Sequence, residues 1–118
     1  MKIMVTGSRD WDRPDIVTNK LMLYKNNRPT IIVGDCPTGV DKIVKQFCYM
    51  NDWPVVVYEA DWNRHGRAAG PIRNRAMTLA EPDLCLAFPK GESRGTRNAI
   101  KTAKAAGILT VIIDYDSF

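Results

Sequence analysis

Short apolar segments alternate with amphipathic ones along this chain. Five runs of aliphatic and aromatic residues are each bounded by glycine, proline or charged residues, which is typical of buried strands. They are Lys2–Thr6, Thr30–Val33, Pro54–Tyr58, Leu84–Phe88 and Leu109–Ile113. The first two runs end at Gly7 and Gly34, where tight turns are expected.

The segment after the second run has the clearest helical periodicity. Its apolar residues repeat at i, i+3, i+4, i+7 and i+8, which puts them on one helical face. They are Val40, Ile43, Val44, Phe47 and Cys48. Thr38 and Asp41 stand ahead of this face in a T-x-x-D pattern related to the capping box, so they are expected to start the helix.

Three further helices are predicted from weaker patterns. Asp12 is expected to cap the first, with Pro14 in its opening turn. A later helix is expected to start at Pro71, with Arg73 on the flank of its buried stripe and Asn74 nearly opposite. That stripe would consist of Ile72, Ala76, Leu79 and Ala80. The last helix should run from about Thr96 to Ala106 and stop at Gly107.

Strands that alternate with helices favour an α/β fold with a parallel sheet of about five strands and helices on both faces. The length fits a single domain over residues 1–118. In such a sheet, ligands bind beyond the carboxyl ends of the strands, near helix N-termini. Four loops are expected there, and they hold most of the glycine and arginine: "GSRDW", "GDCPTGVD", "EADWNRHGRAAGPIRNRAM" and "PKGESRGT".

The net charge of +4 and the pI near 9.1 agree with an anionic ligand but do not separate a nucleotide from a nucleic acid. No apolar run is long enough to span a bilayer, and the N-terminus does not resemble a secretory signal. We therefore expect a cytoplasmic protein without a membrane partner, of bacterial or phage origin. The widely spaced Cys36, Cys48 and Cys85 fit neither a disulfide framework nor a zinc site, and no metal or cofactor is expected.

The second loop has the glycine spacing of a phosphate-binding Walker loop without its working residues. Val40 occupies the lysine position and Asp41 the position of the magnesium-binding hydroxyl, so a P-loop NTPase is excluded. Gly34, Asp35, Gly39 and Asp41 remain candidates for ligand contact. Whether Asp41 only caps the helix or also binds a ligand hydroxyl stays open.

The other loops supply donors for a phosphate. Gly7, Ser8 and Arg9 offer backbone N–H groups, a hydroxyl and a guanidinium. Ser93, Gly95 and Thr96 directly precede the last helix, where free N–H groups suit an anion.

Arginine and tryptophan in the third loop add two candidate contacts. The planar fork of Arg73 suits bidentate contact with phosphate, whereas Arg75 better fits a surface salt bridge. Trp11 and Trp62 are candidates for stacking on a base, with packing of the loops as an equal alternative.

Taken together, these motifs resemble the YspA-type, YpsA-related branch of the SLOG superfamily, whose relatives include the LOG proteins and DprA. The resemblance rests on "GSRDW", "G-x-x-x-x-G-V-D", "DW...G..AG..RN..M" and "S-x-G-T", and it implies a Rossmann-like fold. LOG enzymes cleave the N-glycosidic bond of nucleoside monophosphates. By that resemblance Arg73 would bind phosphate and ribose, and Asn74 beside it is a further candidate for ligand contact. Ala99 occupies the position of the LOG glutamate.

Three functions follow. The first is a sensor or processing module that binds a nucleotide or nucleotide-derived ligand such as ADP-ribose, with phosphate on the loop donors and ribose hydroxyls on Asp41 or Asp35. The second is a nucleotide N-glycosidase or phosphoribohydrolase that uses Arg73 with Asp41, Asp35 or Glu92. The third is single-stranded nucleic-acid binding, as in DprA. Against it, the basic residues are expected to be confined to the loops. Oligomers are usual in the superfamily, so the resemblance implies a homo-oligomer.

Overall fold

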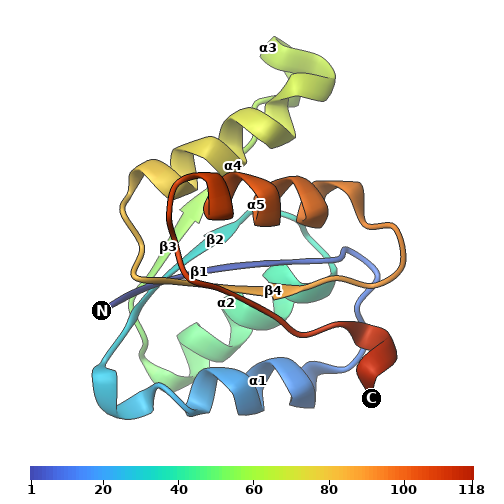
Figure 1. The fold of residues 1–118 in the computed structure, drawn as a ribbon. Coiled ribbons are helices and arrows are strands. Elements are labelled where there is room, and N and C mark those ends of the chain that lie inside the picture. Colours follow the sequence, from blue (N-terminus) through green and yellow to red (C-terminus); the bar gives the residue numbers. More distant parts are fainter.

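The computed structural model describes residues 1–118 as a five-stranded parallel sheet between two layers of helices (Figure 1). All five predicted strands are present, with ends that differ by no more than one residue from the sequence expectation. They are β1 (Lys2–Gly7), β2 (Thr30–Gly34), β3 (Val55–Tyr58), β4 (Leu84–Phe88) and β5 (Thr110–Ile112).

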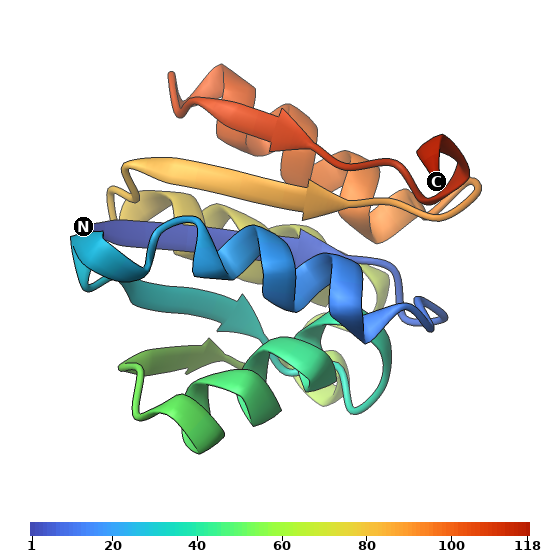
Figure 2. The ribbon, with the colours of Figure 1, turned by 90° about the horizontal axis from the view of Figure 1, so that it is seen from below.

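The strand order is β3-β2-β1-β4-β5, with every neighbouring pair parallel. Figure 2 shows this order from the outer green strand to the outer red one, with all strands pointing the same way. After β1, the chain adds β2 and then β3 on one side of that strand. It then adds β4 and β5 on the other side of β1. The crevice between β1 and β4, at their carboxyl ends, is therefore the position where this fold class binds ligands.

The helices are α1 (Pro14–Met22), α2 (Gly39–Asn51), the short α3 (Trp62–His65), α4 (Ala69–Leu79) and α5 (Arg94–Ala105). Single 3-10 turns lie at η1 (Lys25–Asn27), η2 (Gly66–Ala68) and η3 (Tyr115–Ser117). Helices α1 and α2 cover one face of the sheet, and α4 and α5 cover the other (Figure 1). No helix is long and apolar enough to cross a membrane.

Alternate residues of the central strands supply the two cores. Ile3 and Val5 pack with α1 and α2 in a cluster of 14 buried residues, whereas Met4 packs with α4 and α5 in a cluster of six. The smaller cluster uses Ala99 and Ala103 of α5, and these short side chains let the helix approach the sheet closely. The buried thiols Cys48 and Cys85 act as small apolar groups, and burial raises their pKa values to about 11 and about 12.

One expected helix cap is wrong, and a second is confirmed in its position but not in its hydrogen bond. Arg13, not Asp12, precedes α1, and the Asp12 carboxylate instead accepts a hydrogen bond from the Tyr115 hydroxyl. Thr38 does occupy the residue before α2, but its hydroxyl donates to the Arg9 carbonyl instead of accepting from the helix. In both cases a contact with a distant segment replaces the local one, which sequence spacing does not reveal.

The expected buried face of α4 is also wrong. The helix begins at Ala69, and Ile72 and Leu79 of the predicted stripe are exposed. Asn74 is buried instead, with Met77 and Thr78. A polar side chain is stable there because the Asn74 amide nitrogen donates to Gly95 O and Asn98 Oδ1 of α5. Helix α5 likewise starts earlier than predicted, so Thr96 lies inside its first turn and not ahead of it.

Candidate functional site

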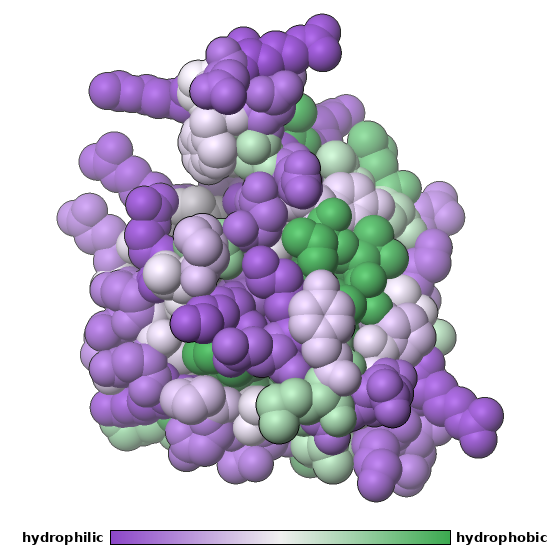
Figure 3. Space-filling view, turned by 180° about the vertical axis from the view of Figure 1, so that it is seen from behind, coloured by the Kyte–Doolittle hydropathy of each residue, from purple (hydrophilic) through white to green (hydrophobic).

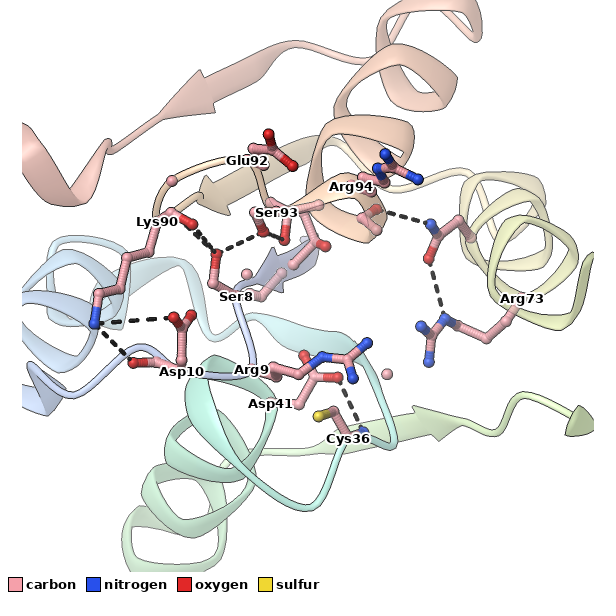
Figure 4. Close-up of a pocket in the computed structure, with 18 of the residues that line it drawn as sticks. Ser8, Arg9, Asp10, Cys36, Asp41, Arg73, Lys90, Glu92, Ser93 and Arg94 are labelled. Carbon is pink, nitrogen blue, oxygen red and sulfur yellow. Dashed lines mark hydrogen bonds and ion pairs between the residues drawn. The ribbon is translucent and has the colours of Figure 1, made fainter. Parts of the chain in front are cut away.

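A polar cavity of about 520 Å³ opens at the carboxyl ends of β1, β2 and β4 (Figure 4). We call the side formed by residues 90–96, with the first turn of α5, the α5 wall. The opposite side, where β1 and β2 end against the start of α2, is the strand wall. The cavity is lined by Val5, Thr6, Gly7, Ser8, Arg9, Asp10, Gly34, Cys36, Asp41, Arg73, Asn74, Met77, Lys90, Gly91, Glu92, Ser93, Arg94, Gly95 and Thr96.

Hydroxyl groups connect the two walls. Ser8 Oγ accepts from the backbone N–H of Lys90 at 2.6 Å and donates to Ser93 Oγ at 2.6 Å. Ser93 Oγ in turn donates to Thr96 Oγ1 at 2.8 Å. Ser8 and Thr96 are buried, so this chain of hydroxyls fixes the β1–α1 loop against the start of α5.

The start of α5 is not capped by a side chain. Ser93 precedes the helix with φ of 42°, a left-handed conformation that is costly for a residue other than glycine, and its hydroxyl makes no cap hydrogen bond. The first-turn N–H groups of Arg94, Gly95 and Thr96 have no acceptor within the helix, as in any helix start. A Cβ atom added at Gly95 would meet no atom within 4 Å. The α5 wall therefore offers backbone donors beside open space, which suits an anion.

Arg73 reaches the cavity from α4 (Figure 4), and its guanidinium is held by two other side chains. Its Nη1 pairs with Asp35 Oδ1 at 3.1 Å, and its Nε donates to Asn74 Oδ1 at 3.0 Å. Its Nη2 makes no hydrogen bond within the protein and remains available to a ligand. Fixing the rest of the guanidinium lowers the entropy cost of that contact.

Asp41 is the buried carboxylate of the cavity, only 7% exposed. Its Oδ2 accepts from the Cys36 N–H at 3.1 Å, and its Oδ1 has no donor within the protein. Burial raises the pKa of Asp41 from 3.8 to about 6, against the opposing effects of the Cys36 N–H and the charges of Arg73 and Lys45. An acceptor that is short of donors, beside a cavity, is suited to a ligand hydroxyl.

Glycines of the strand wall are required by packing. A Cβ atom at Gly7 would overlap the Val40 side chain, and one at Gly39 would overlap the backbone of Ser8 and Arg9. At Gly34 it would lie 2.5 Å from Arg73 Nη1 and 2.7 Å from Asp41 Oδ2. Gly34 thus provides the space in which Arg73 and Asp41 approach each other.

Most of the residues predicted for ligand contact lie together around this cavity: Gly7, Ser8, Arg9, Gly34, Asp41, Arg73, Asn74, Ser93, Gly95 and Thr96. Three predicted residues do not line it. Asp35 lies behind Arg73, where it also accepts from the Ala60 N–H, and Gly39 lies behind the Ser8 loop. Trp62 is 54% exposed on α3 and lies near Gly70.

Four further cavity residues were not predicted from the sequence: Asp10, Cys36, Lys90 and Arg94. Glu92, a candidate for the hydrolase function only, also lines the cavity. Each of these residues belongs to one of the four loops expected at the carboxyl ends of the strands. Membership of such a loop is therefore the signal that could have identified them. Trp11 is buried against Phe88 and Tyr115, so it anchors its loop and does not stack on a ligand. Ala99, in the position of the LOG glutamate, is fully buried in the α4–α5 core. No group of three metal-binding side chains is present.

The basic residues are not confined to the loops, contrary to the sequence reading. Residues 62–107 contain nine Lys and Arg against three Asp and Glu, a net charge of +6, whereas the whole chain has +4. Four of these cations are exposed along α5, at spacings that give one helical face. They are Arg94, Arg97, Lys101 and Lys104.

Comparison with known proteins gives two matches. Residues 1–65 match the model of the YspA, cpYpsA-related SLOG family, a range that includes the strand wall with Gly7, Gly34 and Asp41. The chain is also 35% identical over 115 residues to the Gene 61 protein of Mycobacterium phage D29, with 91% of each chain covered.

Proposed function

Because the chain belongs to the YspA, cpYpsA-related SLOG family, we propose that it binds a nucleotide or nucleotide-derived ligand, such as AMP or ADP-ribose, in this cavity. The family membership suggests nucleotide-related binding or processing. The chemistry of the two cavity walls supports the choice of ligand. Such a ligand carries phosphate, hydroxyl groups and a base, and the walls offer partners for the first two.

The observation that carries this proposal is Gly95. A glycine inside a helix costs about 1 kcal/mol relative to alanine, and no neighbouring atom requires it, because a Cβ there would meet nothing. It lines the cavity in the first helical turn, beside uncapped N–H groups. A bound phosphate that approaches the backbone closely accounts for the missing side chain. Arg94 would add a guanidinium, and Thr96, whose hydroxyl donates to no protein atom, would add a hydroxyl.

The other end of the ligand would lie near Asp41 and Arg73. The free Oδ1 of Asp41 would accept from a ribose hydroxyl, and the free Nη2 of Arg73 would donate to a phosphate or ribose oxygen. The ends of both side chains border the space beside Gly34. The carboxylate therefore selects for a hydroxyl-bearing ligand, while the cationic groups attract its phosphate.

Thermal unfolding with a panel of ligands tests this proposal. AMP, ADP, ADP-ribose, NAD and inorganic phosphate would each be added to the wild-type protein, to Arg73→Ala and to the matched control Arg75→Ala. Arg75 is exposed on the same helix and forms no ion pair, so its loss should change nothing. A ligand at about 100 times its Kd should stabilise the wild type by about 2.7 kcal/mol. A shift that survives in Arg73→Ala, or no shift with any nucleotide, would contradict the proposal.

A second candidate is hydrolysis of a nucleotide N-glycosidic bond, which Asp41 favours. A carboxyl group with a pKa of about 6 beside the ribose site can stabilise positive charge on the sugar or accept a proton from water near neutral pH. Incubation with the nucleotide that binds, followed by chromatography of the released base, tests it. Asp41→Asn should then abolish turnover while it retains measurable binding, whereas no base release by wild type would exclude catalysis.

The same panel should include a single-stranded oligonucleotide, because the exposed cations of α5 would attract a phosphate backbone. The double variant Lys101→Glu/Lys104→Glu tests their part, with Lys25→Glu/Arg28→Glu, two exposed cations in the turn before β2, as the matched control. We expect nucleotide binding to be unchanged in both. Steep salt dependence of oligonucleotide binding that is lost only in the α5 variant would favour nucleic acid as the ligand.

We also propose that the chain forms a homo-oligomer and acts in the cytoplasm. Figure 3 shows one compact apolar patch on an otherwise largely hydrophilic face of the molecule. Exposed apolar side chains in this part of the fold include Val56 of the edge strand β3 and Ile72 and Leu79 of α4. Light scattering after size-exclusion chromatography of wild type and Leu79→Lys checks the oligomer, which the substitution should weaken.

A further inference from the structure

The C-terminal end of the chain contacts two loops beside the cavity, residues 8–13 between β1 and α1 and residues 89–93 between β4 and α5. Turn η3 follows β5 and lies beside the carboxyl ends of the strands, where Figure 2 marks the C-terminus. The Tyr115 N–H donates to the Pro89 carbonyl at 3.0 Å, just before the α5 wall. The Tyr115 carbonyl accepts from Arg13 Nη1 at 3.3 Å, at the end of the β1–α1 loop.

The Tyr115 side chain makes contact with the same two loops. Its hydroxyl donates to Asp12 Oδ1 at 2.7 Å, and this hydrogen bond lowers the pKa of Asp12. Its ring packs edge-on against Trp11, with 5.1 Å between the ring centroids. The cations of Arg13 and Lys90 lie 4.0 and 4.5 Å from the ring centroid. One side chain thus contacts both segments through four different interactions.

Lys90 is where these contacts meet the cavity. It lines the cavity, and its backbone N–H is the one bonded to Ser8 Oγ. Its Nζ donates to the Asp10 carbonyl at 3.3 Å and lies 4.0 Å from Asp10 Oδ2, as Figure 4 shows. The Tyr115 ring is the third contact of that ammonium group. An ammonium on a flexible stem loses much conformational freedom on binding, and prior contacts reduce that loss.

We propose that Tyr115 is a positioning residue of the ligand site, which holds Lys90 and the β1–α1 loop in the arrangement that receives an anionic ligand. This inference rests on the proposed function for the ligand itself. Tyr115 does not line the cavity, so it acts through the contacts of its ring with Lys90, Trp11 and Arg13. The C-terminal turn is in this way part of the site, although no motif of the sequence marked it.

A purely structural role for Tyr115 predicts different behaviour, because its ring also packs at the edge of the α1–α2 core. We therefore compare Tyr115→Phe, which keeps the ring, with Tyr115→Leu, which keeps much of the apolar volume but loses the ring face. Tyr49→Leu is the matched control, since Tyr49 is an exposed tyrosine on α2. Lys90→Met is made alone and combined with Tyr115→Leu.

Two measurements are made on the intact chain. Amide hydrogen exchange of segments 8–13 and 89–93, without ligand, reports the order of the two loops. Calorimetric titration with AMP reports affinity. We expect Tyr115→Leu to raise exchange in both segments and to weaken AMP about tenfold, whereas Tyr115→Phe and Tyr49→Leu stay within about threefold of wild type. In the Lys90→Met background, the effect of Tyr115→Leu on AMP affinity should be clearly smaller, because only the part that acts through the β1–α1 loop remains.

Unchanged exchange in Tyr115→Leu would overturn the proposal. An equal loss of AMP affinity with and without Lys90 would also overturn it, as would a Tyr115→Leu chain that does not fold. If the wild type binds no nucleotide at all, the proposed function fails, and the exchange measurement alone decides whether Tyr115 holds the two loops. The two measurements thereby distinguish failure of the proposed nucleotide binding from failure of the proposed positioning role of Tyr115.

Discussion

The two walls of the cavity both contain glycines, but for different reasons. On the strand wall, Gly7, Gly34 and Gly39 each occupy a position where a side chain would overlap another group of the protein. On the α5 wall, a side chain at Gly91 or Gly95 would meet no atom within 4 Å. Gly91 has a left-handed φ of 64°, which itself favours glycine, whereas Gly95 lies in regular helix.

This difference separates the requirements of the fold from those of the ligand. The strand wall is closely packed because β1, β2 and α2 must approach one another there. The α5 wall is open although a helix would be more stable with alanine in its first turn. A residue that lowers stability without a structural reason is a sign of function, and the predictions that follow use this contrast.

Gly7→Ala should have the largest effect on stability. Its methyl group would overlap Val40 between β1 and α2, and neither element can move without disturbing the main core. We expect a loss of about 3 kcal/mol in the free energy of unfolding, measured by urea denaturation. A loss below about 1 kcal/mol would mean that the strand wall is not closely packed.

Gly34→Ala should damage binding more than folding. The nearest atoms are the ends of the Arg73 and Asp41 side chains, which can move aside at modest cost. Both groups would then leave their positions in the cavity, and nucleotide affinity should fall about 10- to 100-fold, as when a charged hydrogen bond is lost. Calorimetric titration measures this, and a large loss of stability with unchanged affinity would contradict it.

Asp41→Asn should stabilise the folded chain at neutral pH and weaken ligand binding. The pKa of Asp41 is about 6 when folded and about 3.8 when unfolded, so between these values the folded state binds more protons. The free energy of unfolding therefore falls as pH rises from about 4 to about 6. Asparagine lacks this charge and can still accept from the Cys36 N–H.

Thermal unfolding at several pH values tests this prediction. The variant should gain about 1–3 kcal/mol over wild type at pH 7.5, and the gain should vanish near pH 4. Binding of the wild type to a ribose-bearing ligand should also weaken below pH 6 as the carboxylate is protonated. A pH-independent difference between the two proteins would show that the charge of Asp41 is not its cause.

Gly95→Ala should have the smallest effect on stability and the opposite sign to Gly7→Ala. The added methyl group meets no protein atom, and alanine favours the helix by about 0.5–1 kcal/mol. Nucleotide affinity should nevertheless fall, because the methyl group occupies the space beside the first-turn N–H groups. Unfolding and titration of the same preparation check both signs, and unchanged affinity would remove the main argument for a phosphate at the α5 wall.

The strand pattern and the loops could be predicted, whereas the orientation of α4 could not. Buried strands of a parallel sheet are uniformly apolar, so β1 and β4 are visible in the sequence. The buried face of α4 includes Asn74, which a hydrophobic pattern assigns to solvent. It is buried because Gly95 and Asn98 of α5 supply acceptors for its amide, and those partners are known only once the two helices lie side by side.

The residues of the site also fall into two groups, those that the sequence predicts and those that only the fold identifies. Sequence alone was sufficient to assign ten of the cavity residues, because glycine, serine and arginine after a strand lie at the carboxyl edge of any parallel sheet. Tertiary structure decided that Asp35 supports Arg73, that Trp62 lies outside the cavity, and that Tyr115 contacts Lys90 and the β1–α1 loop. These facts depend on contacts between residues that are far apart in the chain. Local sequence determines which element a residue belongs to, but only packing of the elements determines what its side chain meets.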